Sequence, residues 1–306
     1  MTWLRKKEEA LEVISRVREL ELKAREIAEG ALIGLHHSRH RGSSIEFSEH
    51  KPYSPGDEIR LIDWKLFAKS DRFFIKQFED ETRIQSYLIL DASGSMAYPE
   101  EGAKFSKFEY ARFLTAGLAY LLLGQGDAVG LAIIRNGKLD WIPCRSGERH
   151  FMALAEFLTR AKPEGETRFG PVLFDLISRF KKKSLMVLIS DFFDPEMEVE
   201  KSLKLARHRK NELAFFQVLT REEMEFPFSQ LSWFEGLEGE GRILLEPAQL
   251  RRQYLKLIRA WQEKLKRIGQ ELLADYQLFR IDENPAQILS AYLLRRAQIA
   301  RRARAR

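Results

Sequence analysis

The chain has 306 residues, which is enough for a large hydrophobic core and one or two domains. Apolar residues make up 44% and charged residues 31% of the chain, and no apolar run approaches the roughly 20 residues of a membrane-spanning helix. The formal net charge of +6 is local, because residues 295–306 hold six arginines and no acidic residue. The sequence therefore indicates a globular protein without a basic domain.

The two ends of the chain and its single cysteine bear on its location. The first residues are charged and contain no apolar segment of the kind that a secretory signal needs, and Cys144 alone excludes an internal disulfide. We expect a cytoplasmic protein. The arginine-rich tail reads as the solvated end of a last helix, with contact to nucleic acid or an acidic partner as the alternative. No aromatic residues alternate with these arginines, which argues against stacking on bases.

Residues 3–34 carry apolar side chains at helical spacing and contain no glycine or proline before Gly30. They predict one amphipathic helix that packs on a core. A partner-binding or coiled-coil role is the alternative. The apolar face consists of Leu4, Leu11, Ile14, Val17, Leu20, Ile27 and Ala31.

Residues 35–83 differ from the rest because turn-forming residues separate short β-prone runs. We expect short strands at 45–47, 59–64 and 73–78. This segment is predicted to be a small β-rich lobe between the N-terminal helix, residues 1–34, and a larger domain, residues 84–306.

From residue 84 onward, strand and helix patterns alternate. Strands are predicted at 84–90, 128–134, 138–142, 184–189, 213–219 and 276–281. Helices are predicted at 107–123, 149–160, 171–180, 196–208, 248–269 and 285–302. Residues 221–246 read as irregular, with one β segment at 242–245. This alternation predicts an α/β fold with a doubly wound, mostly parallel sheet and helices on both faces.

Hard oxygen ligands follow the first of these buried strands. Asp91, Ser93 and Ser95 lie at alternating positions around a glycine, and Asp191 ends a later strand. Thr167 stands in the loop before the helix predicted at 171–180. Because the carboxyl ends of parallel strands share one sheet edge, these five side chains are expected to converge. Their chemistry fits a divalent cation, best Mg²⁺, with Mn²⁺ or Ca²⁺ as alternatives.

Two other interpretations of this constellation remain. Aspartate and serine after a strand often form only turns and helix caps, which would leave a scaffold with a degenerate metal site. A haloacid-dehalogenase-type phosphotransferase would also place an aspartate after its first strand. That chemistry needs a second aspartate two residues later, where this chain has Ser93, whose hydroxyl cannot act as the acid/base.

The DASGSM segment resembles the metal-ion-dependent adhesion site of von Willebrand factor A-type domains. Asp91, Ser93 and Ser95 match its Asp-x-Ser-x-Ser signature, Thr167 matches its loop threonine, and Asp191 matches its final aspartate. The resemblance implies a Mg²⁺ ion whose open position receives an acidic side chain of a binding partner.

The segment before it resembles the bacterial family catalogued as domain of unknown function 58, which joins such a lobe to a von Willebrand A-type core. The matching positions with a scaffold or partner-binding role are Tyr53, Pro55, Gly56, Asp57, Arg60, Asp63 and Trp64. The family resemblance implies a non-enzymatic adaptor for a MoxR-type AAA+ ATPase, or for a client protein, in chaperone-like maturation or stress response. Many members carry two N-terminal membrane spans that this sequence does not show, so we expect a soluble form.

Overall fold

The computed structural model describes residues 2–39, 50–52, 67, 73–76, 85–99, 102–166, 169–180, 183–193 and 198–304. By internal contacts the chain divides into two units. The first combines Met1–Leu35 with Ile84–Arg306, and the second is His36–Arg83. Within the described residues, no helix is both long and apolar enough to cross a membrane.

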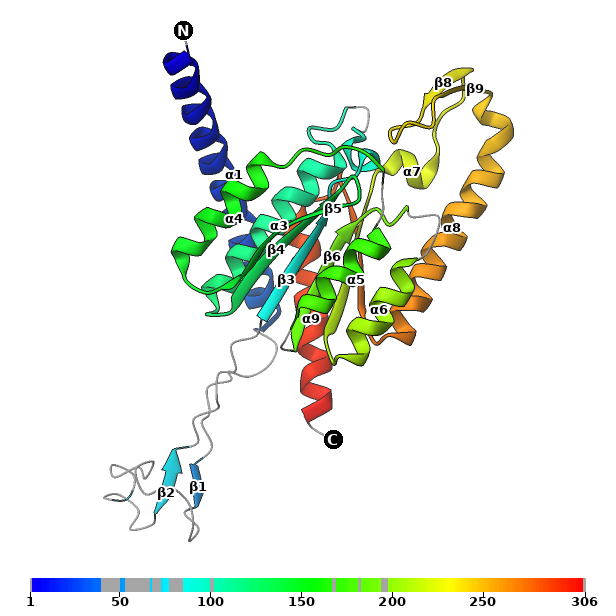
Figure 1. Cartoon of the computed structure of the whole chain (residues 1–306). Helices are drawn as coiled ribbons and strands as arrows, with labels where there is room; N and C mark the ends of the chain where they lie inside the picture. The colour runs from blue at the N-terminus through cyan, green and yellow to red at the C-terminus, as the bar shows by residue number, and fades with distance from the viewer. Residues whose placement is uncertain are drawn as a thin grey trace. The chain divides into compact units, whose positions relative to one another are not determined.

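A six-stranded sheet forms the centre of the first unit, in the order β10-β7-β6-β3-β4-β5 (Figure 1). Its strands are β3 (Gln85–Asp91), β4 (Ala128–Arg135), β5 (Lys138–Arg145), β6 (Ser184–Ser190), β7 (Glu212–Leu219) and β10 (Asp275–Arg280). All neighbouring strands run parallel except β4 and β5, which form a hairpin. The predicted doubly wound, mostly parallel sheet is confirmed.

Helices cover both faces of this sheet, and their buried side chains form two clusters. One cluster joins α1 (Thr2–Arg39), α3 (Lys107–Gly124), α4 (Glu148–Arg160) and α9 (Pro285–Arg304) to one face. The other joins α5 (Phe169–Arg179), α6 (Glu198–His208) and α8 (Pro247–Glu271) to the opposite face. Strand β3 contributes side chains to both clusters, because Leu88 belongs to the first cluster and Tyr87 to the second. Such two-sided burial explains its unbroken apolar sequence.

Helix α1 packs closely on α3. A side chain added at Gly117 of α3 would place its Cβ 2.6 Å from Cγ2 of Ile27, so only glycine lets the two helices approach this far. Val17, Leu20 and Ile27 are buried as expected, but Ile14 is 50% exposed, so its assignment to the apolar face is wrong. The side chains of Leu4 and Leu11 lie outside the described residues.

In the second unit the described residues form a two-stranded antiparallel sheet. Strand β1 (His50–Pro52) pairs with β2 (Phe74–Lys76), which falls within the strand predicted at 73–78. The ring of Phe67 stacks on that of Phe73 at a centroid distance of 4.3 Å. The other two predicted strands and the motif from Tyr53 to Trp64 lie outside the described residues.

Residues 221–246 are more regular than the sequence suggests, so that prediction is corrected. They contain helix α7 (Arg221–Glu225) and a hairpin in which β8 (Ser232–Glu235) pairs with β9 (Arg242–Leu245). Strand β9 confirms the β segment predicted at 242–245, whereas β8 has only four residues and exposes Trp233, which masks its strand pattern. The arginine-rich tail, residues 295–306, is also less solvated than expected, because the Arg296 side chain forms ion pairs with Glu212 and Asp275.

Candidate functional site

The candidate site lies where the winding of the sheet reverses. Strand β3 has β4 on one side and β6 on the other, so the chain leaves β3 in one direction and later returns on its other side. In open α/β sheets this reversal opens a crevice at the carboxyl ends of the two strands. Here Asp91 is the last residue of β3, Ser190 is the last residue of β6, and Asp191 follows Ser190 directly.

Asp91 is 1% exposed, and protein donors hold both of its carboxylate oxygens. The Ser93 N–H donates to Oδ1 at 2.9 Å, and the Ser190 hydroxyl donates to Oδ2 at 2.5 Å. Burial and the nearby charge of Asp191 raise the pKa of Asp91 to about 7, although these hydrogen bonds oppose the shift. Since both donors are electrically neutral, Asp91 has no hydrogen-bonded cation among the described residues.

Ser93 and Ser95 present their hydroxyls on the short loop after β3, where residues 94–97 form the 3-10 turn η2. The two Oγ atoms lie 3.2 Å apart. The Gly94 N–H donates to the Gly165 carbonyl at 2.8 Å, and the Glu164 N–H donates to the Ala92 carbonyl at 2.9 Å, so backbone contacts hold this loop. Adjacent oxygens in an octahedral Mg²⁺ shell lie about 3 Å apart, which this hydroxyl pair approaches.

Asp191 is fully buried and has a cation of its own. The Lys107 ammonium donates to Asp191 Oδ2 at 2.7 Å and to Glu223 Oε1 at 2.5 Å. Burial alone would lower the pKa of Lys107, but the charges of Asp191 and Glu223 outweigh it and raise that pKa above its ordinary value. The Phe193 N–H donates to Asp191 Oδ1 at 3.0 Å, so both of its oxygens are also occupied.

Lys107 is a site residue that our sequence interpretation did not include. It is the first residue of α3, directly after Ser106, which forms a capping box with Glu109. A positive charge at a helix N-terminus opposes the helix dipole, and Lys107 is only 1% exposed at the start of an apolar helix. A lysine at the first position of an apolar helix is the one local feature that points to Lys107, but it does not identify Asp191 or Glu223 as its partners.

The residues present fit a divalent cation in their chemistry. Asp91, Ser93, Ser95 and Asp191 come together at the sheet edge, linked through Ser190. Over the described ranges, no three His, Cys, Asp or Glu side chains surround a common point, so an ion here would depend on the serine hydroxyls. The fifth predicted ligand, Thr167, lies outside the described residues and stays a prediction.

The β8–β9 hairpin also reaches this loop, which the sequence did not predict. Its connecting turn places Glu238 Oε1 3.3 Å from the Ser95 nitrogen, whose N–H donates to it. A Cβ added at Gly94 would lie 2.3 Å from the Leu237 carbonyl oxygen, so glycine is required for this contact. A contact across 143 residues has no local sequence signal.

Comparison with known proteins identifies the family. Residues 49–264 match the family described as "Protein of unknown function DUF58". The chain belongs to this family. That match includes the predicted lobe motif and the ends of β3 and β6, so the resemblance inferred from the sequence is confirmed at the level of the family.

Relatives of this DUF58 chain include two bacterial proteins without an assigned activity. The "Uncharacterized protein Rv1480" of Mycobacterium tuberculosis is 25% identical over 214 residues, which are 69% of this chain and 66% of that protein. The "Uncharacterized protein YeaD" of Bacillus subtilis is 27% identical over 146 residues, 48% of this chain and 32% of that protein. The chain thus spans slightly less than two thirds of the mycobacterial relative.

Similar solved structures include "conserved hypothetical protein BatB" from Bacteroides thetaiotaomicron. It has 17% sequence identity and a TM-score of 0.46, over 70% of this chain and 99% of that one. The SpRpn10 VWA domain has 13% identity and a TM-score of 0.38, over 68% of this chain and 94% of that one.

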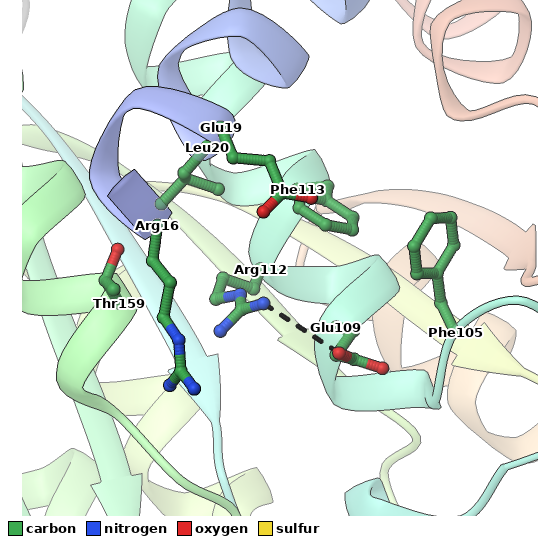
Figure 2. A pocket seen from close by; sticks show the side chains of 8 residues that line it. All are labelled: Arg16, Glu19, Leu20, Phe105, Glu109, Arg112, Phe113 and Thr159. Atoms are coloured by element: carbon green, nitrogen blue, oxygen red, sulfur yellow. Dashed lines mark ion pairs between the residues drawn. The ribbon is translucent and has the colours of Figure 1, made fainter. Parts of the chain in front are cut away.

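A separate hollow of the DUF58 chain lies between α1, α3 and α4. Figure 2 shows Arg16 and Arg112 there beside Glu19 and Glu109, with Arg112 paired to Glu109 at 4.0 Å. Two arginines thus accompany two glutamates, so the hollow has no excess charge that would select an ion. The chemistry of the sheet edge is therefore not repeated at this hollow.

Proposed function

We propose that this chain is a non-enzymatic, metal-dependent protein-binding adaptor. The observation that carries the proposal is the hydroxyl pair of Ser93 and Ser95, 3.2 Å apart, beside the buried carboxylates of Asp91 and Asp191. Ser93 and Ser95 would hold the cation directly. Asp91 and Asp191, whose oxygens already accept hydrogen bonds, would act through their charge and through bound water. The cation would supply an attraction for a carboxylate of a partner protein.

The charge balance of the cluster supports a cation. Asp91, Asp191 and Glu223 are three carboxylates, and among the described residues Lys107 is the one ammonium that is hydrogen-bonded within this group. Buried charge without compensation is costly, so this excess of negative charge favours an additional positive ion. Mg²⁺ suits a site with hydroxyl ligands and bound water, and Mn²⁺ or Ca²⁺ are the alternatives.

The environment of Asp91 argues against nucleophilic catalysis. A nucleophilic carboxylate needs an oxygen that the substrate can reach, whereas Asp91 is 1% exposed and both of its oxygens accept hydrogen bonds. Ser93, two residues later, cannot serve as a general acid near neutral pH. These features favour a binding role over phosphoryl transfer.

A metal titration tests the proposal. Isothermal titration calorimetry with Mg²⁺ and Mn²⁺ should show one site in the wild type and a loss of affinity of at least about tenfold in Asp91→Ala and Ser93→Ala. Asp175→Ala is the matched control, because Asp175 pairs with Arg179 on the exposed surface of α5. Equal, negligible affinity in the wild type and Asp91→Ala would disprove the metal site.

The partner is a proposal that rests on the family resemblance. We propose a MoxR-type AAA+ ATPase, or a client protein that presents an acidic residue. Affinity capture from the native host should recover this ATPase with the wild type in Mg²⁺, and less of it with EDTA or with Asp91→Ala. Equal recovery in all three cases would contradict metal-bridged binding.

One observation favours a second candidate function. The Lys107 ammonium lies 2.7 Å from Asp191 Oδ2, so part of the negative charge is already compensated without a metal. In this alternative the site is a degenerate one that only stabilises the sheet edge, and the chain is a scaffold. The same titration separates the two functions, because a scaffold would bind no ion.

A further inference from the structure

The β8–β9 hairpin reaches the loop that carries Ser93 and Ser95. Residues 236–241 connect its two strands, and the Gly236 N–H donates to the Gly241 carbonyl at 2.8 Å to close the connection. Near the centre of this turn, Leu237 lies against Gly94 and the Glu238 carboxylate accepts a hydrogen bond from the Ser95 N–H. The turn of the hairpin therefore contacts the loop that carries the two proposed hydroxyl ligands.

The charge of Glu238 is unexpected in this place. Asp91 and Asp191 already make the sheet edge negative, and a further carboxylate adds repulsion unless a cation lies nearby. The N–H that holds the Glu238 carboxylate belongs to Ser95, whose hydroxyl would hold the ion, so an acidic ligand of that ion would meet the same N–H. Glu238 thus resembles a bound ligand that belongs to the same chain.

The hairpin is attached in a way that permits its release. Among its apolar side chains, Trp233 is 67% exposed and Ile243 is 56% exposed, so neither is anchored in the core. Phe234 packs on Phe226 and Phe228 at centroid distances of 6.0 and 5.6 Å and forms an anchor on one side. Isolated two-stranded hairpins are marginally stable, so separation of the turn from Gly94 carries a small cost.

We propose that Glu238 occupies the seat for the acidic ligand at the cation site, so that a partner's carboxylate must displace the β8–β9 hairpin to bind. This inference rests on the proposed metal-dependent function. It adds that, in the resting protein, the Glu238 carboxylate blocks access of an external carboxylate to the cation site. It also predicts that release of the hairpin strengthens binding of an external carboxylate.

Two variants release the hairpin by different routes. Glu238→Ala removes the internal carboxylate. Gly94→Ala introduces a Cβ that would lie 2.3 Å from the Leu237 oxygen and so pushes the hairpin away. Alanine adds no backbone strain here, because the φ angle of Gly94 lies outside the left-handed region that favours glycine. Glu235→Ala is the matched control, since it removes the same charge from the same hairpin, where Glu235 pairs with Arg242 at 3.3 Å.

The probe is N-acetylglutamate α-amide, which carries one glutamate side chain, added to the Mn²⁺-loaded whole chain and followed by NMR line broadening. Both release variants should bind it at least about tenfold more tightly than the wild type and Glu235→Ala do. Hydrogen–deuterium exchange gives a second readout: Mn²⁺ should slow exchange of residues 232–245 in the wild type but not in Glu238→Ala.

The outcomes separate this inference from the proposed function. If the wild type binds Mn²⁺ and Asp91→Ala does not, but Glu238→Ala behaves like Glu235→Ala in both readouts, the internal ligand is disproved and the metal site stands. If the wild type binds no Mn²⁺, both proposals fail. Should Gly94→Ala not fold, Glu238→Ala alone decides.

Discussion

The ends of β3 and β6 carry the same functional group in opposite surroundings. Asp91 at the end of β3 accepts hydrogen bonds from a backbone N–H and a serine hydroxyl, both neutral. Asp191 at the end of β6 accepts one from the buried ammonium of Lys107. Two aspartates that look equivalent in the sequence therefore differ in their electrostatics.

The difference assigns different roles to the two strand ends. Asp191 has a counter-ion built into α3, because the Lys107 ammonium donates to its carboxylate at 2.7 Å. In the part of the chain that the structure describes, Asp91 has no hydrogen-bonded cation, and burial with the nearby charge of Asp191 raises its pKa, so its ionised form is costly without a further cation. We therefore expect the end of β3 to respond to pH in the absence of a metal ion.

The largest effect should follow from removal of the built-in cation. Lys107→Met leaves Asp191 and Glu223 buried without a positive charge, and breaking a buried ion pair in this way costs about 3–5 kcal/mol of the free energy of unfolding. Urea denaturation of the whole chain measures this loss. Adding Asp191→Asn to Lys107→Met should recover part of it.

A surface lysine provides the control for this comparison. Lys204→Met breaks a pair with Glu200 in which the lysine side chain is 60% exposed, and should change the free energy of unfolding by less than about 1 kcal/mol. If Lys107→Met were as mild as Lys204→Met, the assignment of a structural counter-ion to Asp191 would be wrong.

An intermediate effect should appear in the pH dependence of the metal-free protein. Burial and Asp191 raise the pKa of Asp91 to about 7 in the folded state, and an unfolded aspartate has a pKa of about 3.9. The folded state therefore binds more protons between these values, so stability falls as pH rises from about 4 to about 7. In EDTA, Asp91→Asn should be more stable than the wild type at about pH 8, by the order of 2 kcal/mol.

Thermal unfolding of both proteins at two pH values measures this difference. The gap between Asp91→Asn and the wild type should close at about pH 4, where Asp91 is protonated. Added Mg²⁺ should stabilise the wild type at about pH 8 and leave Asp91→Asn unchanged. A gap that does not vary with pH would show that Asp91 does not titrate in this range.

The smallest effect should come from the neutral donor at the end of β3. Ser190→Ala removes the 2.5 Å hydrogen bond to Asp91 and the acceptor of the Phe192 N–H, which should cost about 1 kcal/mol. Ser178→Ala on the exposed side of α5 loses a hydrogen bond only to its own helix and should be nearly neutral. Equal unfolding midpoints for the two variants would contradict the claim that the hydrogen bond from Ser190 to Asp91 stabilises the end of β3.

Strong periodicity made most of the first unit predictable. The apolar run before Asp91 and the alternation of strands with helices identified the sheet, because a short unbroken apolar run between turn residues is typical of a strand buried on both faces. Asp91, Ser93 and Asp191 lie at or just after the carboxyl ends of parallel strands, so the sequence also predicted that they would meet at one edge of the sheet. These are local signals combined with a general rule of topology.

Long-range partners could not be predicted in the same way. Glu223 lies 116 residues from Lys107 in the sequence, and Glu238 lies 143 residues from Ser95. Neither pair has a spacing that local structure fixes. Strand β9 matches the β segment predicted at 242–245, but β8 has no clear signal, because Trp233 is an apolar residue that is 67% exposed.

The packing of α1 on α9 has a consequence for the order in which the chain can fold. Gly30 and Gly34 of α1 lie against Ala286 and Ser290 of α9, so the two helices touch although more than two hundred residues separate them. During synthesis α1 emerges first. Its apolar face has no packing partner until α3, and finally α9, has been synthesised. Contacts of such high sequence separation slow folding and leave apolar surface exposed to aggregation. The part of α1 that contacts α9 therefore stays uncovered until the last helix has been made.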